Sequence, residues 1–289
     1  MTKTLLICTF GPLFCLAAEL PDISSIPADL TVPALMEKAP APGLRVKHQL
    51  PGYASSIYHV LYLPTDWQKD AQMPLIVEFA GNGGYKNKYG DVSTGRPEGS
   101  NLGYGLTGGK SALWLCLPYL NARSTDIAIK WWGDAPAYDP QPTLKYAREA
   151  VQNVLRDFGG DPRRVLLCGF SRGAIACGYL GLHDDETSAL WTAFFAYSHF
   201  DGIKTWPYPA SDRASALTRL QRIGNRPVFI CAESTQTEET EKVLRPLLPT
   251  ADLTFHPTGF RNHNDAWLLR PCHSREKARE WLSGVFSKP

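Results

Sequence analysis

The chain has 289 residues, of which 44% are hydrophobic and 20% are charged, and its formal net charge is +2 at pH 7. This composition excludes wholesale disorder and supports a sizeable core in one large domain or two small ones. The near-neutral charge argues against binding to nucleic acid or to a membrane surface through a basic face, so we expect neither as a partner.

Residues 1–18 have the pattern of a secretory signal peptide. Lys3 makes the start positive, and residues 5–16 are apolar but too short to span a bilayer. Ala17 and Ala18 are small residues of the kind found at cleavage sites. A buried N-terminal helix is the alternative. No other segment is long and apolar enough to cross a membrane. We therefore expect a secreted or periplasmic protein without stable membrane insertion after removal of the signal.

A proline-rich arm, residues 19–43, follows the signal pattern and shows little periodicity. The remainder, residues 44–289, alternates strand and helix patterns. The predicted strands cover residues 55–64, 74–81, 112–120, 165–170, 191–198, 226–233 and 251–257, and the predicted helices cover 144–160, the residues after 171, and 274–286. This alternation predicts one α/β domain whose central sheet of about eight strands is mostly parallel and carries helices on both faces. Residues 82–111 are rich in glycine and lack a helical period, so we expect a long functional loop there.

The cysteines do not indicate a disulfide framework. Seven are present, and two of them, Cys8 and Cys15, belong to the signal pattern. The other five are Cys116, Cys168, Cys177, Cys231 and Cys272. Their number is odd and three of them lie in apolar runs, so we expect buried free thiols. The spacing of cysteines and histidines shows no ligand pair, and we expect neither a metal site nor another cofactor.

The most informative stretch is the motif Gly169-Phe170-Ser171-Arg172-Gly173, which follows a predicted strand and precedes a predicted helix. In that context the turn at Ser171 is too tight for side chains two residues away, and the serine oxygen stands above the carboxyl edge of the sheet. The helix that begins at Arg172 points free amides and the positive end of its dipole at the same place. A glycine-serine turn without chemistry is the alternative, but the flanking strand and helix favour a nucleophile.

A serine nucleophile needs a general base and an acid that orients it. In folds with this motif the order along the chain is serine, acid, histidine. His263 is the predicted base because it lies in a loop after the last strand pattern. Glu233 directly follows the preceding strand and is the favoured acid, and Asp201, one strand earlier, is the alternate acid. We favour Glu233 because orienting the imidazole needs a carboxylate near the His263 loop.

The developing oxyanion needs two hydrogen-bond donors that are held in place beforehand. One is the backbone amide of Arg172. The other is expected from the glycine-rich loop after the second predicted strand, at Asn82 or Gly83. The side chain of Arg172 has two possible uses: it binds a carboxylate of the substrate, or it pairs with a local acid such as Asp201 or Asp134.

These residues together resemble the α/β-hydrolase superfamily, in which a glycine-rich loop, a Gly-x-Ser-x-Gly nucleophile, an acid and a histidine follow in that order, and the likeness covers residues 74–265. Within it, FGGDPRRVLLCGFSRGA (158–174) resembles the secreted serine esterases: feruloyl and acetyl-xylan esterases, polyhydroxybutyrate depolymerases and dienelactone-hydrolase-like proteins. Two features depart from that group, because AGNGG (80–84) replaces a His-Gly-Gly type of loop and Glu233 replaces the usual Asp. The resemblance implies ester hydrolysis through an acyl-enzyme at Ser171.

Aromatic side chains in the predicted overhanging loops suit a sugar or a phenolic ring. Trp131 and Trp132 lie in one of these loops, and Trp132 is a predicted substrate-binding residue, with a role in capping the core as the alternative. We therefore expect a secreted serine carboxylic-ester hydrolase that acts on ester-decorated carbohydrate or a related small ester. A serine peptidase on the same fold and a non-catalytic carbohydrate-binding relative are the alternatives.

Overall fold

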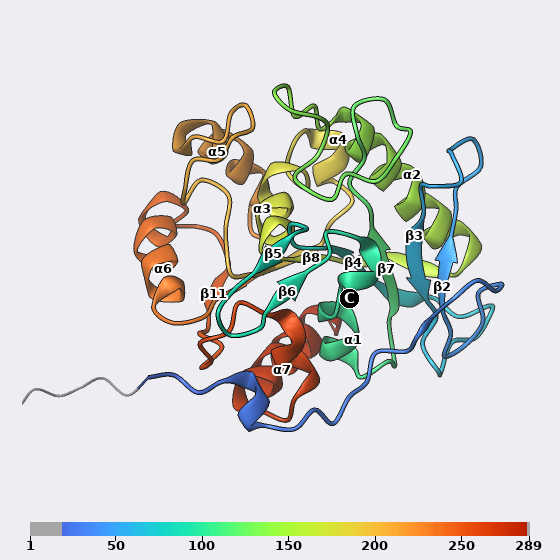
Figure 1. Cartoon of the computed structure of the whole chain (residues 1–289), viewed down its shortest axis with the longest axis horizontal. Helices are drawn as coiled ribbons and strands as arrows, with labels where there is room; N and C mark the ends of the chain where they lie inside the picture. The colour runs from blue at the N-terminus through green and yellow to red at the C-terminus, as the bar shows by residue number, and fades with distance from the viewer. Residues whose placement is uncertain (1–18, 288–289) are drawn as a thin grey trace, which may run out of the picture.

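A nine-stranded sheet runs through the molecule in the order β1-β2-β3-β7-β4-β8-β9-β10-β11 (Figure 1). The computed structural model describes residues 19–287, so the predicted signal peptide lies outside the described residues. The strands are β1 (Leu35–Met36), β2 (Arg45–His48), β3 (His59–Tyr62), β4 (Met73–Phe79), β7 (Leu113–Leu117), β8 (Gly160–Phe170), β9 (Ala193–Tyr197), β10 (Val228–Cys231) and β11 (Leu253–Phe255). β3 is antiparallel to both of its neighbours, and the other described pairs of this sheet are parallel. The predicted α/β sheet is confirmed.

Helices cover both faces of this sheet. They are α1 (Leu102–Thr107), α2 (Gln141–Asp157), α3 (Arg172–Tyr179), α4 (Asp185–Ser188), α5 (Arg213–Leu220), α6 (Gln236–Leu247) and α7 (His273–Phe286). Side chains of β4 alternate between two cores: Leu75 and Val77 pack with α2 and α3, whereas Ile76 packs with α1 and α7. Burial on both faces explains why β4 is a continuous apolar run. In the described chain, none of these helices is both long enough and apolar enough to span a bilayer.

The glycine-rich segment 82–111 contains more regular structure than its composition predicts. Its first half holds the antiparallel pair β5 (Tyr85–Lys86) and β6 (Val92–Ser93). Its second half holds helix α1, so the expectation of one long loop without a helix is wrong there. A Cβ on Gly103 would collide with the ring of Trp114. Close packing on the sheet, rather than helix propensity, stabilises this short helix.

The proline-rich arm lies against the domain. The backbone amides of Asp29 and Leu30 donate to the carbonyl of Leu269, at 3.2 Å each. Asp29 also forms an ion pair with Arg275, which is buried. Further along, β1 pairs with β2 and extends the sheet. The contacts of Asp29 and Leu30 join residues that are far apart in sequence, so no periodic pattern in the sequence could reveal them.

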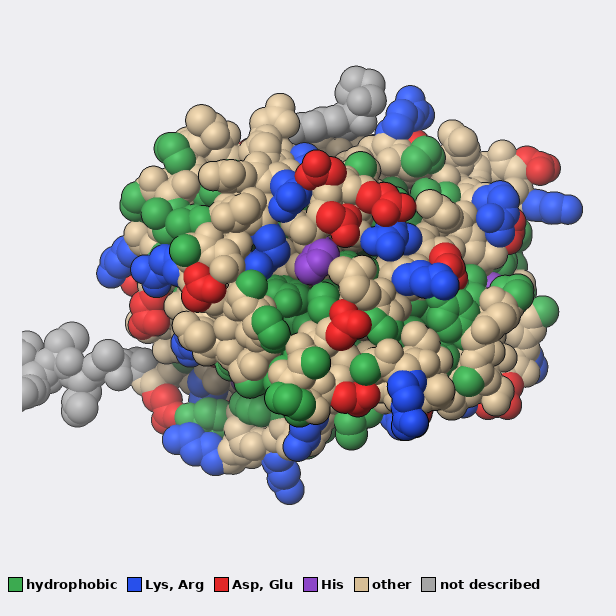
Figure 2. Space-filling model, turned by 90° about the horizontal axis from the view of Figure 1, so that it is seen from above, with side chains coloured by type: hydrophobic (Ala, Val, Ile, Leu, Met, Phe, Trp, Pro, Cys, Tyr) green, Lys and Arg blue, Asp and Glu red, His purple; other side chains and the backbone are tan. Residues whose placement is uncertain are grey.

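The cysteines of the described chain are free, as predicted. They are Cys116, Cys168, Cys177, Cys231 and Cys272, of which the last is half-buried and the others are buried. In residues 19–287, no group of three or more His, Cys, Asp or Glu is placed to hold a metal ion. Figure 2 shows basic and acidic side chains mixed over the face seen from above Figure 1, with no large area of one sign.

The turn between β8 and α3 depends on two glycines. A Cβ on Gly169 would collide with the backbone of Gly173, and a Cβ on Gly173 would collide with the carbonyl of Phe79 in β4. Helix α3 therefore starts in direct contact with both strands. Ser171, the N-cap residue, has φ 56° and ψ −112°, a conformation that is costly for a residue with a side chain. The expected tightness of the turn is confirmed.

The substitution Gly173→Ala tests this close approach. We expect it to lower the free energy of unfolding by about 3 kcal/mol, the upper end of the range for overpacking, because a backbone carbonyl cannot rotate away. Urea unfolding, monitored by circular dichroism, measures the change in the free energy of unfolding. Gly284→Ala in α7 is the matched control: no atom lies within 4 Å of its added Cβ, so we expect a gain of up to about 1 kcal/mol. A Gly173→Ala variant as stable as the parent would contradict the packing argument.

Candidate active site

Ser171 is held in its strained turn by hydrogen bonds of its own backbone. Its N–H donates to the carbonyl of Tyr197 in β9 at 2.9 Å. Its carbonyl accepts from the amides of Ala174 and Ile175, at 3.1 and 3.2 Å. These bonds fix the residue between the neighbouring strand and the first turn of α3. The serine therefore stands at the carboxyl end of β8 and is half-exposed.

Three side chains from three separate loops meet at this point. The Nε2 atom of His263 lies 3.0 Å from Ser171 Oγ, and its Nδ1 atom lies 2.7 Å from Glu233 Oε1. When Nδ1–H donates to the carboxylate, Nε2 is left free to accept the proton of the serine hydroxyl. The structure thus brings together the predicted nucleophile, the predicted base and the favoured acid.

The carboxylate of Glu233 is buried, with 6% of the residue exposed. Its Oε1 atom also accepts from Ser198 Oγ and from Gln236 Nε2, both at 3.1 Å. Burial raises the pKa of a carboxyl group, but the hydrogen bond and the charge of His263 outweigh it and hold the pKa of Glu233 below its ordinary value. Glu233 is therefore an ionised acceptor at neutral pH.

Asp201, the alternate acid, is engaged elsewhere. It is fully buried and accepts hydrogen bonds from Nε and a terminal nitrogen of Arg219, at 3.0 and 2.9 Å. Burial raises the pKa of Asp201 to about 6, although Arg219 acts in the opposite direction. In the described chain no hydrogen bond joins Asp201 to His263. Its visible role is to neutralise a buried arginine.

The loop after β9 supplies two neighbours of His263 that sequence reasoning missed. Ser198 Oγ lies 2.8 Å from His263 Nδ1, and the ring of His199 lies 5.4 Å from that of His263, measured between centroids. Burial, followed by the charge of His263, lowers the pKa of His199 to about 4, so His199 is neutral at neutral pH. The sequence does carry a signal for Ser198 and His199, because both lie where a predicted strand ends, in the loop that also contains Asp201.

The side chain of Arg172 is buried beneath the site, with 1% of the residue exposed. Its guanidinium group donates to carbonyls of three loops, those of Gly81, Gly95, Ala128 and Trp131. It also stacks on Tyr119, with 3.6 Å from Cζ to the ring centroid. Burial lowers the pKa of Arg172 to about 10, so the group remains charged at neutral pH. It pairs with neither Asp201 nor Asp134 and is shielded from any substrate, so both suggested uses of this side chain are wrong.

The loop after β4 uses one of the two expected donors and leaves the other free. The N–H of Gly83 donates to the carbonyl of Ile129 at 2.6 Å, and Asn82 Oδ1 accepts from the N–H of Trp131 at 2.9 Å. The backbone N–H of Gly83 is therefore already used in a hydrogen bond. Among residues 19–287, the backbone N–H groups of Asn82 and Arg172 have no hydrogen-bond partner. Both amides are therefore available to bind an anion.

Trp132 belongs to the core rather than to a binding surface. It is fully buried and stacks on Tyr179, with 4.8 Å between centroids. The prediction that Trp132 binds substrate is wrong, and its role in capping the core is the one observed. Trp131, in contrast, is half-buried; its ring lies 5.3 Å from that of Trp206, which lies 5.4 Å from His199. These three rings form an aromatic row between His199, which lies next to His263, and Trp131, whose backbone N–H binds Asn82.

Comparison with known proteins identifies the fold. No protein-family model and no curated protein matches the chain. Solved structures do match. A thermostable esterase is 16% identical, with a TM-score of 0.51 over 83% of this chain and 62% of its own length. A fungal esterase from Rhizomucor miehei is 12% identical, with a TM-score of 0.51 over 84% and 82%. A Bacteroides ovatus protein described as a dipeptidyl aminopeptidase IV has a TM-score of 0.53 at 14% identity, over 78% and 33%. The chain has the α/β-hydrolase fold of these structures.

Substitution of Arg172 by lysine tests its role as a link between loops. Lysine keeps the charge but lacks the planar group that reaches several carbonyls, so we expect the free energy of unfolding to fall by about 3 kcal/mol or more. We also expect faster hydrogen exchange in residues 80–84 and 128–131. Arg156→Lys, at an arginine exposed on α2, is the control and should change stability by no more than about 0.5 kcal/mol. Equal unfolding midpoints for the two variants would refute this role.

Proposed function

We propose that this protein is a serine hydrolase that cleaves carboxylic esters through an acyl-enzyme formed on Ser171. The observation that carries the proposal is the continuous chain of contacts from Ser171 Oγ through His263 to Glu233, at 3.0 and 2.7 Å. The structural neighbours that are esterases support the choice of reaction, since they place the same kind of chemistry on this fold.

Acylation begins when the Ser171 oxygen attacks the carbonyl carbon of the ester. His263 Nε2 takes the hydroxyl proton as the new bond forms, and the ionised Glu233 stabilises the imidazolium. The carbonyl oxygen becomes an oxyanion that accepts from the free amides of Arg172 and Asn82. When the tetrahedral intermediate collapses, the alcohol leaves with the proton held by His263. The acyl group remains on Ser171.

Deacylation repeats these steps with water. His263 removes a proton from the attacking water, the same two amides of Arg172 and Asn82 bind the second oxyanion, and the Ser171 oxygen leaves with the proton returned by His263. The products are the carboxylic acid and the restored serine. No group beyond the residues already described is needed to balance either half of the reaction.

The substrate we propose is an ester-decorated carbohydrate or a related small ester, met outside the cytoplasm. The aromatic row of His199, Trp206 and Trp131 supports a ring-shaped substrate, because the face of an aromatic ring packs well against a sugar or a phenol. The signal-like residues 1–18 support export. Hydrolysis of acetylated, feruloylated and methyl-glucuronoyl sugars, compared side by side, identifies the acyl and alcohol groups.

The two alternatives are less well supported. A non-catalytic carbohydrate-binding protein would be favoured by the lack of an acid beside the histidine, but Glu233 lies 2.7 Å from His263. A serine peptidase would use the same three residues, and one structural neighbour is described as a peptidase. Cleavage of aminoacyl p-nitroanilides, lost in Ser171→Ala, would favour the peptidase over the esterase.

The first test is hydrolysis of p-nitrophenyl acetate and butyrate. Ser171→Ala and His263→Ala should each lower kcat by at least about 10⁴-fold, because nucleophile and base act as one unit. His273→Ala, which removes an exposed histidine at the start of α7, is the matched control and should keep the parent activity. Unchanged hydrolysis in Ser171→Ala would exclude the mechanism.

The second test distinguishes the two acids. Glu233→Gln should lower kcat by about 10³–10⁴-fold, because an amide does not hold the imidazole in the required tautomer. Asp201→Asn should leave kcat within about threefold while lowering the free energy of unfolding by about 3–5 kcal/mol, since it strands the buried charge of Arg219. A larger loss of kcat in Asp201→Asn than in Glu233→Gln would reverse the assignment.

A further inference from the structure

A buried aspartate holds the backbone of the loop that carries His263. The N–H of His263 donates to Asp91 Oδ2 at 3.0 Å. The side chains on either side of the histidine, Asn262 and Asn264, both donate to Asp91 Oδ1 at 3.1 Å. Asp91 thus contacts three consecutive residues of the loop. It is 2% exposed and comes from the turn between β5 and β6, which is far away in sequence.

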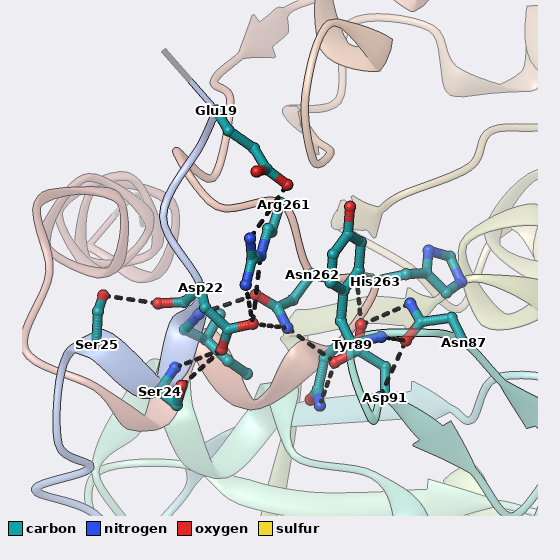
Figure 3. A network of polar contacts seen from close by, with 12 residues as sticks. Glu19, Asp22, Ser24, Ser25, Asn87, Tyr89, Asp91, Arg261, Asn262 and His263 are labelled. Atoms are coloured by element: carbon teal, nitrogen blue, oxygen red, sulfur yellow. Dashed lines mark hydrogen bonds and ion pairs between the residues drawn. The ribbon is translucent and has the colours of Figure 1, made fainter.

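The same loop is held from the opposite side by residues 19–23, as Figure 3 shows. The N–H of Ile23 donates to Asn262 Oδ1 at 2.8 Å, and Asn262 Nδ2 lies 3.3 Å from Asp22 Oδ2. The N–H of Arg261 donates to the carbonyl of Pro21 at 3.1 Å. Arg261 also pairs with the carboxylates of Glu19 and Asp22. Asn262 is therefore the residue at which the two sides meet.

The hairpin that presents Asp91 is itself fixed to the site. Asn87 donates to Asp91 Oδ2 at 2.7 Å and to the hydroxyl of Tyr85 at 3.1 Å. The ring of Tyr85 packs edge-on against His263, with 4.8 Å between centroids. The hairpin thus contacts both the imidazole and the backbone of His263.

A carboxylate is the side chain that these surroundings require. Asp91 faces four N–H donors, from His263, Asn262, Asn264 and Asn87. A carboxylate is acceptor-only and offers two oxygens, whereas an amide in its place would turn an NH₂ group toward some of these donors. Hydrogen bonds to an ionised acceptor are also shorter and stronger than neutral ones. The loop is therefore held by charge-assisted bonds rather than by packing alone.

We propose that Asp91 and residues 19–23 form one clamp that positions His263 for catalysis, with Asp91 as its principal positioning residue. The inference rests on the proposed function for its effect on catalysis, whereas the contacts that form the clamp do not depend on that function. Neither part touches Ser171 or Glu233. Both act through the backbone and through Asn262, and a shift of about 1 Å in the reacting atoms costs about 10²-fold in rate.

The test is Asp91→Asn in the full-length protein, read in two ways. Hydrogen exchange of residues 261–266 should become faster, and kcat for p-nitrophenyl acetate should fall by about 10-fold or more while KM stays within about twofold. Asp161→Asn is the matched control. Asp161 is equally buried and accepts the amide of Arg163 at 2.9 Å, but it lies at the opposite end of β8 from Ser171. Asp161→Asn should change neither the hydrogen exchange of residues 261–266 nor kcat.

Hydrogen exchange is measured without substrate, so the clamp and the proposed ester hydrolysis can fail separately. Faster exchange in Asp91→Asn, in a protein that hydrolyses no ester, would keep the clamp and overturn the proposed function. Parent-like exchange in Asp91→Asn, or a parent-like kcat in an active enzyme, would overturn the clamp.

Asp22→Ala tests whether residues 19–23 belong to the same clamp. We expect a smaller fall in kcat, of about threefold, and combination with Asp91→Asn should lower kcat by no more than about twofold beyond Asp91→Asn alone, since residues that act through one partner are not additive. Fully multiplicative effects would show that the two sides act independently and would overturn the single clamp.

Discussion

The site depends on the close approach of α3 to the sheet. Because Gly173 lies against the carbonyl of Phe79, and Gly169 against Gly173, the chain must turn sharply at Ser171. That turn forces a left-handed φ on Ser171 and leaves the first amides of α3 unpaired. A single added methyl group at either glycine would push helix and strand apart. The position of Ser171 and the free amide of Arg172 are thus consequences of one packing constraint.

The same constraint explains why the charged side chain of Arg172 is buried. Arg172 is the first residue of α3, and its side chain is buried, with 1% of the residue exposed. It is stabilised by stacking on Tyr119 and by the carbonyls of three loops that cover the site. Arg172 therefore joins the elbow to the loop that presents Asn82. In the proposed mechanism the backbone amide of Arg172 binds the oxyanion, and its buried side chain holds the loop of the second proposed donor, Asn82.

Tyr197 connects the two halves of the candidate site. Its carbonyl accepts from the N–H of Ser171, and its hydroxyl donates to the carbonyl of Asn262 at 2.8 Å and accepts from the N–H of Asn264 at 3.2 Å. The hydroxyl thus contacts the residues on either side of His263, which Asp91 also holds. One buried residue thus binds Ser171 through its backbone carbonyl and the loop of His263 through its hydroxyl.

The sequence predicted those features that depend on local pattern. The buried strands, the elbow at Ser171 and the loops with Glu233 and His263 all follow from apolar runs, turn chemistry and chain order. It could not predict contacts that depend on three-dimensional packing. The burial of Trp132 and Arg172 depends on neighbours that are distant in sequence. The pairing of Asp201 with Arg219, which separates Asp201 from Glu233 as the acid, depends on such a neighbour too.

Covalent labelling shows whether Ser171 is an activated nucleophile. A fluorophosphonate phosphonylates a serine hydroxyl that a neighbouring base activates, and peptide mass spectrometry locates the modified residue. We expect one phosphonyl group per chain, on the peptide that contains Ser171, and no adduct in His263→Ala under the same conditions. An unlabelled parent protein, or a label on any other residue, would contradict this role of Ser171.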